Sequence, residues 1–146
     1  MKEIEMRLFG RASIVVPIVL GLLLTACGNN SPREVTITLT DFKIEASQTG
    51  FEAGVPYRFV VTNSGAINHE FMIMPSLTQD QMGMGMSMGE MDEMAVAMIE
   101  EDELPPGATK TIEITFQEPA PAGTLEFACH VEGHYEAGMK LPITVK

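Results

Sequence analysis

Residues 34–40 alternate between polar and apolar side chains, and this period of two is the feature that most constrains the fold. Val35, Ile37 and Leu39 take every second position, with threonines between them. Successive side chains of a strand point to opposite faces, so the pattern predicts a half-buried β-strand. Further short segments rich in Val, Ile, Phe or Thr lie at 57–62, 69–74, 109–116, 124–129 and 140–145. Short strands separated by turn residues predict an all-β sandwich rather than an α/β fold.

Length and charge limit what such a domain does. A chain of 146 residues with two cysteines is too short for a multi-domain enzyme, and it has too few apolar spans for a polytopic membrane protein and too few cysteines for a disulfide-stapled miniprotein. The nine Lys and Arg against 20 Asp and Glu give a net charge of −11. This charge repels phosphate backbones, so we expect no nucleic-acid binding and favour cations or basic proteins as partners.

The first segment has the organisation of an export signal. Basic residues precede an apolar run at 12–24, which is too short to cross a bilayer as a helix. The run ends in Leu24-Thr25-Ala26-Cys27, which resembles the bacterial lipobox, whose cysteine carries lipid in the mature protein. We expect a lipoprotein anchored at a membrane and facing the periplasm or cell exterior. An ordinary signal peptide with an incidental cysteine is the alternative, and both interpretations predict export.

These boundaries predict a lipoprotein signal peptide at 1–26, a lipidated tether at 27–33 and one folded domain at 34–146. Within that domain, an insert from about 75 to 106 shows no strand pattern and is rich in acidic residues and methionine. Its methionines are Met82, Met84, Met86, Met88, Met91, Met94 and Met98. The spacing of the last three predicts a short amphipathic helix from about Glu90 to Glu101. Clustered thioethers select Cu(I), so the seven methionines are a candidate Cu(I) site, additional to the site described next. A flexible surface insert is the alternative.

The segment 129–139 carries the chemistry. Cys129, His134 and Met139 follow one another at equal intervals, and Gly133 and Gly138 allow tight turns between them. One loop can therefore bring a thiolate, an imidazole and a thioether round one point. A fourth ligand has to come from elsewhere, and we expect His69 to reach the point from the facing sheet. Two imidazoles, a thiolate and a weak thioether form the ligand set that selects copper for one-electron transfer.

This pattern resembles the cupredoxins, the blue-copper family that includes plastocyanin, azurin, auracyanin and rusticyanin. The Cys-x4-His-x4-Met spacing is most similar to that of auracyanin and rusticyanin. The resemblance implies a Greek-key β-sandwich with one type 1 copper ion. It also implies that the copper ligands are His69, Cys129, His134 and Met139. Many members carry Asn or Ser directly after the first histidine, where it braces the cysteine loop, whereas this chain has Glu70.

His130 is a further candidate, because Cys-His-x3-His is also similar to the corresponding segment of multicopper oxidases. The whole chain has three histidines, which are too few for the additional copper cluster of those enzymes. We therefore expect His130 to point outward at the surface beside the site. A place on an electron path and a contribution to a second, weak metal site are the alternatives.

The leading functional hypothesis is an exported, membrane-tethered electron carrier that is not itself an enzyme, since four protein ligands leave no open position for a substrate. Its acidic surface would meet a redox partner with a basic docking face, such as a cytochrome or a copper oxidase. The alternative is a copper-binding chaperone or resistance protein that captures and delivers the metal. The methionine-rich insert favours this alternative.

Overall fold

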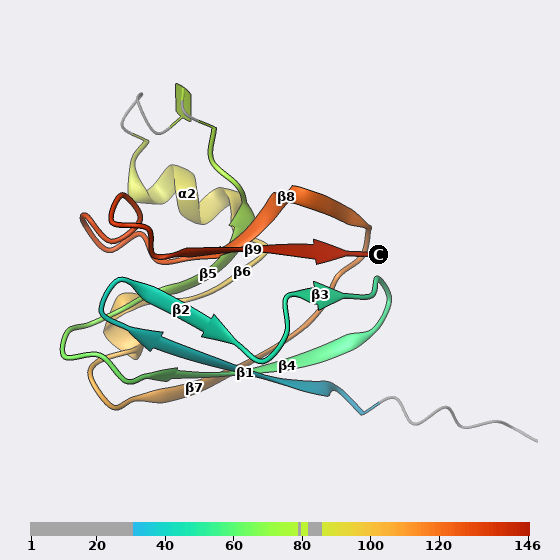
Figure 1. Cartoon of the computed structure of the whole chain (residues 1–146), viewed down its shortest axis with the longest axis horizontal. Helices are drawn as coiled ribbons and strands as arrows, with labels where there is room; N and C mark the ends of the chain where they lie inside the picture. Colours follow the sequence, from blue (N-terminus) through green and yellow to red (C-terminus); the bar gives the residue numbers. More distant parts are fainter. Residues whose placement is uncertain (1–30, 79, 82–85) are drawn as a thin grey trace, which may run out of the picture.

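A computed structural model describes residues 31–78, 80, 81 and 86–146, and within them nine strands form two sheets that stack face to face (Figure 1). The first sheet has the order β2-β1-β4-β7, from Lys43–Ala46, Arg33–Thr40, Pro56–Asn63 and Thr109–Thr115. The second has the order β3-β9-β8-β5-β6, from Gly50–Phe51, Lys140–Val145, Ala120–Ala128, Phe71–Pro75 and Ala97–Ile99. The prediction of an all-β sandwich is confirmed. Among the described residues, no helix has the length and apolar character needed to cross a membrane.

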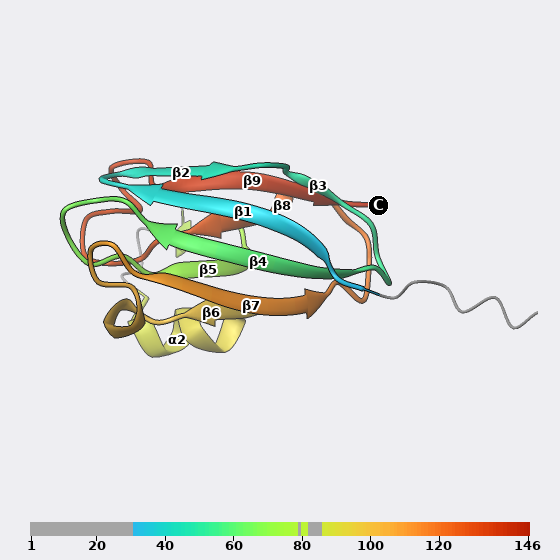
Figure 2. The same cartoon turned by 90° about the horizontal axis from the view of Figure 1, so that it is seen from below.

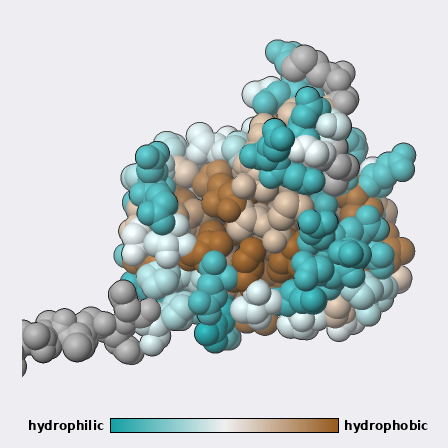
Figure 3. All heavy atoms as spheres, turned by 180° about the vertical axis from the view of Figure 1, so that it is seen from behind, coloured by the Kyte–Doolittle hydropathy of each residue, from teal (hydrophilic) through white to brown (hydrophobic). Residues whose placement is uncertain are grey.

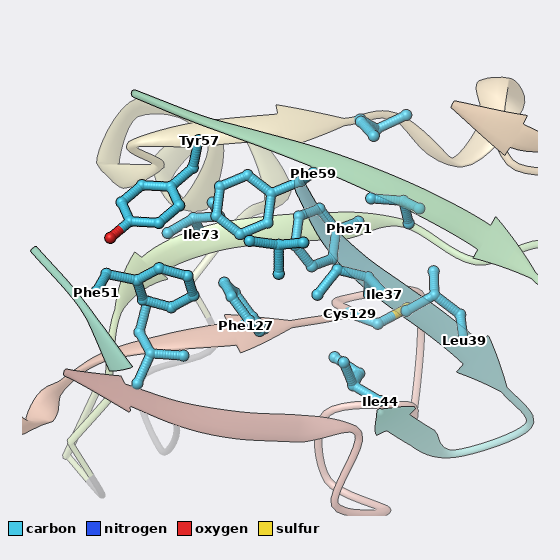
Figure 4. Packing of buried hydrophobic residues seen from close by; sticks show 14 of the residues in the cluster. Ile37, Leu39, Ile44, Phe51, Tyr57, Phe59, Phe71, Ile73, Phe127 and Cys129 are labelled. Atoms are coloured by element: carbon cyan, nitrogen blue, oxygen red, sulfur yellow. The ribbon is translucent and has the colours of Figure 1, made fainter. Parts of the chain in front are cut away.

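The core lies between the sheets, where the alternating pattern places it. Val35, Ile37 and Leu39 are fully buried, while the residues between them face outward or are partly covered. Aromatic rings fill the centre (Figure 4), and the ring of Phe59 lies within 5.7 Å, centroid to centroid, of those of Phe51 and Phe127. Each buried aromatic ring removes a large apolar area from water, so this cluster supplies much of the driving force for folding.

A second apolar layer covers the outer face of the β5–β8 pair. Met72, Met74, Ala128 and Tyr135 are buried there under the insert, which explains why β5 is buried on both faces. The insert contributes helix α2, Met88–Met94, which lies outside the sandwich (Figures 1 and 2). The sequence of a strand that is covered on both faces is a continuous apolar run rather than an alternation of apolar and polar residues.

The predicted helix from Glu90 to Glu101 is wrong in its bounds. Helix α2 begins earlier, because Ser87 and Glu90 form a capping box, and it ends at Met94 with Ala95 as its C-cap. The chain then turns into strand β6, which pairs with the otherwise open edge of β5, and a 3-10 turn follows at Glu101–Glu103. Backbone hydrogen bonds to that edge outweigh the helical spacing of Met98.

The other differences from the expected strands lie at strand ends or in short strands. Strand β8 begins at Ala120, with a register irregularity before Leu125. Strands β2 and β3, which the alternation did not reveal, are four and two residues long. The expected signal peptide, Cys27, Met82 and Met84 lie outside the described residues, as does the side chain of Met88.

Candidate metal centre

Three of the four predicted ligands come together at one end of the sandwich. The Nδ1 atoms of His69 and His134 lie 3.3 Å apart, and the Sγ atom of Cys129 lies 3.9 Å and 3.4 Å from them, respectively. All three side chains are buried, with exposed fractions of 0%, 4% and 0% for His69, His134 and Cys129. In the described part of the chain, these three residues form a group whose donor atoms lie close enough together to hold one metal ion.

The size of this cluster fits a metal ion. A triangle with sides of 3.3, 3.4 and 3.9 Å has its centre about 2.1 Å from each corner, close to the bond lengths of about 2.0–2.3 Å that transition metals form with imidazole and thiolate. Without a metal ion, the two ring nitrogens and the sulfur of this cluster can form only poor hydrogen bonds with one another. The donor set is the soft nitrogen–sulfur combination that suits copper.

The loop from Cys129 to Met139 is closed by its own backbone. The N–H of Cys129 donates to the carbonyl of Met139 at 3.1 Å, and the N–H of Met139 donates to the carbonyl of His134 at 3.0 Å. Gly133 and Gly138 have φ angles of 80° and 98°, which confirms that the tight turns need glycine. The hydrogen bond between Cys129 and Met139 places their backbones side by side. Met139 is fully buried at the end of this loop.

His69 does not come from the facing sheet, and that expectation is wrong. It lies just before β5, and β5 and β8 are neighbours in one sheet, so His69 and Cys129 reach the site side by side. The loop that carries His69 is held by Asn63, whose side-chain amide donates to the carbonyls of Ile67 and Leu104 at 2.8 Å and 2.7 Å. No local sequence pattern indicates this buried anchoring role of Asn63.

Gly65 lies against the buried ring of His69. A Cβ atom added at this glycine would lie 2.7 Å from His69 Nε2 and 2.5 Å from the Oδ1 atom of Asp41. The Asp41 side chain is 45% exposed and can swing away, whereas His69 is fully buried. A larger residue at position 65 therefore has to displace the histidine ring.

We expect Gly65→Ala to weaken copper binding without touching a ligand. Overpacking of this kind costs about 1–3 kcal/mol, and because the displaced group is His69, we expect copper affinity to fall about tenfold or more. Competition with a chelator of known affinity measures this change. The matched control is Gly50→Ala, whose added Cβ would lie 3.7 Å from Thr144 Oγ1, an ordinary contact. Equal affinities for the two variants would contradict the role of Gly65.

Glu70 braces the cysteine loop from the neighbouring strand. Its backbone N–H lies 3.4 Å from Cys129 Sγ, and its buried carboxylate accepts a hydrogen bond from the backbone N–H of His130 at 3.0 Å. Glu70 thus makes the kind of cross-loop contact that the resemblance assigned to Asn or Ser at this position. Burial raises the pKa of this carboxyl group, and the hydrogen bond from His130 lowers it in part.

An exposed aromatic ring borders the site. The ring of Phe42 meets that of His134 edge-on, with centroids 5.2 Å apart, and Phe42 is 50% exposed. Its φ angle of 65° is rare for a residue with a large side chain. Ile67, in the loop before His69, is also exposed, so two apolar side chains of the loops around the site face solvent.

The expectation that His130 lies at the surface is wrong. Its exposed fraction is 8%, and its ring stacks on that of Tyr135 with centroids 4.4 Å apart. The Nε2 atom lies 3.1 Å from the Sδ atom of Met74. His130 does face away from Cys129 and out of the sandwich, but α2 and its neighbours cover that face. Burial lowers the pKa of His130.

Solved structures with the same fold support the comparison with copper proteins. The chain is similar to auracyanin from the photosynthetic bacterium Roseiflexus castenholzii, with a TM-score of 0.57 and 21% identity over 80% of this chain and 98% of that one. It is also similar to an azurin from Methylomonas sp. strain J, with a TM-score of 0.55 and 12% identity over 80% and 99% of the two chains. At these identities the likeness shows the fold. No family model matches the sequence.

Two curated proteins are similar in sequence, and both are described as the copper-resistant cuproprotein CopI. The protein from Pseudomonas aeruginosa is 28% identical over 172 aligned positions, which cover 88% of this chain and 93% of that protein. The protein from Rubrivivax gelatinosus is 30% identical over 115 positions, which cover 78% and 67%. The chain belongs to the CopI family of cupredoxins. The cofactor of this CopI-family cupredoxin is copper, as the fold, the relatives and the buried His–Cys–His cluster together indicate.

The pKa of the Cys129 thiol predicts how copper uptake depends on pH. Burial raises this pKa to about 11, so the thiol of the copper-free protein is protonated at pH 7. Burial, followed by the neighbouring His134, lowers the pKa of His69, which is therefore already neutral at pH 7. A copper ion that binds Cys129 as its thiolate displaces the cysteine proton.

We therefore expect copper affinity to rise about tenfold for each pH unit between pH 7 and pH 8.5. The affinity continues to rise up to the pKa of the thiol in the folded protein and becomes independent of this proton above it. Competition titrations at a series of pH values measure the slope, and calorimetry in buffers of different ionisation enthalpy counts the protons released. An affinity that does not change with pH would contradict a protonated Cys129.

Proposed function

We propose that this protein binds copper outside the cytoplasm and contributes to copper tolerance. The single observation that carries this proposal is the sequence likeness to two copper-resistant cuproproteins over 88% and 78% of the chain. The auracyanin and azurin likenesses are below 25% identity and support the fold without favouring a partner. Conditions outside the cytoplasm are oxidising, and a single thiol there is best protected from oxidation when it is bound to a metal ion.

In this proposal copper would be held by His69 Nδ1, Cys129 Sγ and His134 Nδ1, with the thioether of Met139 as a weaker ligand. When bound, copper supplies reversible one-electron chemistry between Cu(I) and Cu(II). The protein holds the two rings and the sulfur at bonding separations before the metal arrives, and their burial excludes water. Backbone N–H groups of Glu70 and Val131 face the sulfur and favour its thiolate form.

A second candidate function is electron transfer without an enzymatic reaction. The close approach of the three donor atoms, at 3.3–3.9 Å, favours it, because ligands that are already in place need little rearrangement when the metal changes charge. A carrier retains its copper through repeated oxidation and reduction, whereas a delivery protein releases Cu(I) to an acceptor.

We also propose the export signal, the lipid anchor at Cys27 and a basic redox partner as parts of this function. The net charge of −11 supports a basic partner. Acidic side chains gather near the site, where Glu70, Asp92, Glu101 and other residues line a hollow of about 460 Å³. Labelling with a radioactive fatty acid, compared between the native chain and Cys27→Ala, tests the anchor.

The decisive experiment for copper tolerance is a deletion strain of the organism that carries the gene. We expect the deletion to lower the copper concentration that stops growth, and we expect the wild-type gene but not Cys129→Ser to restore it. Ala128→Ser, which places a hydroxyl at a buried position one residue away, is the control for a general loss of stability. Unchanged copper tolerance of the deletion strain would overturn the proposal and leave electron transfer as the function to test.

A further inference from the structure

Two adjacent residues directly after strand β8 face opposite layers of the protein. Cys129 belongs to the core between the sheets, whereas the next residue, His130, lies on the outer side with Met74 and Tyr135. This alternation is the ordinary consequence of strand geometry. The imidazole of His130 is therefore separate from the His69–Cys129–His134 cluster, although it is the neighbour of Cys129 in the chain.

The surroundings of His130 are rich in sulfur. Five methionines, in β5, α2 and β6, pack in this outer cluster: Met72, Met74, Met91, Met94 and Met98. A small cavity of about 80 Å³ opens beside the imidazole and is lined by His130, Tyr135, Met91 and neighbouring side chains. On the same measure a cavity needs about 10–15 Å³ to hold one water molecule, so this cavity has room for an ion next to the histidine.

The geometry of the His130–Met74 contact matches two ligands of one ion. Two donor atoms that each lie about 2.0–2.3 Å from an ion are about 3–4 Å from each other, and His130 Nε2 lies 3.1 Å from Met74 Sδ. The corresponding separations in the His69–Cys129–His134 cluster are 3.3–3.9 Å. The two sites therefore have donor atoms at similar spacing, on opposite sides of the same sheet.

We propose that His130 Nε2, Met74 Sδ and the thioether of Met91 form a second metal site that takes Cu(I). Thioethers are soft ligands that select Cu(I), and imidazole suits copper in both oxidation states. All three ligands are uncharged, and one acidic side chain, Glu136, lines the cavity, so the single positive charge of Cu(I) is tolerated there better than the double charge of Cu(II). The inference does not depend on the function of the cupredoxin centre.

This site replaces the earlier candidate in the insert with a smaller set of residues. Of the seven insert methionines, Met91, Met94 and Met98 pack in the outer cluster, and Met86 lines the cavity. The sulfur that contacts the His130 ring, however, belongs to Met74 of β5, which lies outside the methionine-rich segment. The role of the insert in this account is to cover His130 and to supply one thioether through α2.

The test counts Cu(I) ions on the full-length, copper-free protein by anaerobic titration against a chromogenic Cu(I) chelator. We expect two equivalents for the wild type and one for Cys129→Ser, which keeps only the second site. We expect one equivalent for His130→Phe, whose ring preserves the stacking on Tyr135, and one for Met74→Leu, which nearly preserves volume. The double variant Cys129→Ser/His130→Phe should bind none.

Two controls separate this site from the first one and from misfolding. Met72→Leu changes a buried methionine of the same cluster whose sulfur makes no hydrogen bond to His130 in the described part of the chain, and it should retain two equivalents. The visible spectrum of Cu(II)-loaded His130→Phe and Met74→Leu should match that of the wild type, which shows that the fold and the cupredoxin centre are intact. X-ray absorption of Cu(I) on Cys129→Ser should show both nitrogen and sulfur neighbours.

No Cu(I) bound to Cys129→Ser would overturn the proposal, as would two equivalents on His130→Phe and Met74→Leu. A loss of the visible band in Cys129→Ser with one Cu(I) equivalent retained supports it. If the wild type fails to form a cupredoxin centre but Cys129→Ser still binds one Cu(I) through His130, the first assignment fails and this one stands.

Discussion

Cys129→Ser abolishes the intense visible absorption expected of the copper-loaded protein. The band arises from charge transfer between a thiolate and Cu(II), and a serine hydroxyl in the same place is not ionised at neutral pH. Because loss of a residue that only supports a ligand costs about 10–100-fold in affinity, we expect the loss of the sulfur itself to lower Cu(II) affinity at least about 100-fold. Absorption spectra and chelator competition on the wild type and the variant measure both effects.

The control for this substitution is Ala128→Ser. Both positions are fully buried at the end of β8, but Ala128 faces the outer cluster and Cys129 faces the core. Each variant places a hydroxyl in an apolar layer, so both lose stability, while only Cys129→Ser loses the sulfur. A visible band that survives in Cys129→Ser would show that the sulfur does not bind the metal.

Phe59→Ala is the change that we expect to destabilise the fold most. The Phe59 side chain is fully buried at the centre of the sandwich, in contact with the rings of Phe51, Tyr57, Phe71 and Phe127. Its removal loses the transfer free energy of the ring and leaves a cavity, which together cost about 3–5 kcal/mol. That is a large share of the about 5–15 kcal/mol that stabilises a typical domain.

Urea unfolding of the copper-free protein measures this loss without the contribution of bound metal. The matched control is Phe42→Ala, because Phe42 is 50% exposed, and substitutions on the surface change stability by about 0.5 kcal/mol or less. Similar unfolding midpoints for the two variants would contradict the central position of Phe59. The face of the molecule seen from behind also carries an apolar area bordered by hydrophilic residues (Figure 3). This area is on the surface and is distinct from the buried core around Phe59.

Local sequence patterns determined the sandwich and the loop that carries three ligand types. Alternation at Val35, Ile37 and Leu39 specifies which face of β1 is buried, because strand geometry has a period of two in any context. The interval from Cys129 to Met139 and the glycines within it specify a closed turn, since only a few residues separate the side chains. Structural properties that depend on near neighbours in the chain can therefore be predicted from the sequence.

Tertiary structure alone decided which strands are neighbours and what covers them. His69 joins Cys129 from the adjacent strand because β5 and β8 pair in one sheet, a contact across 60 residues that no local pattern encodes. The insert covers the outer face, and this cover buries His130 against Met74 and Tyr135. Edge pairing with β5 turned the end of the predicted helix into β6. Each outcome depends on the free energy of contacts between distant segments, which only the assembled fold provides.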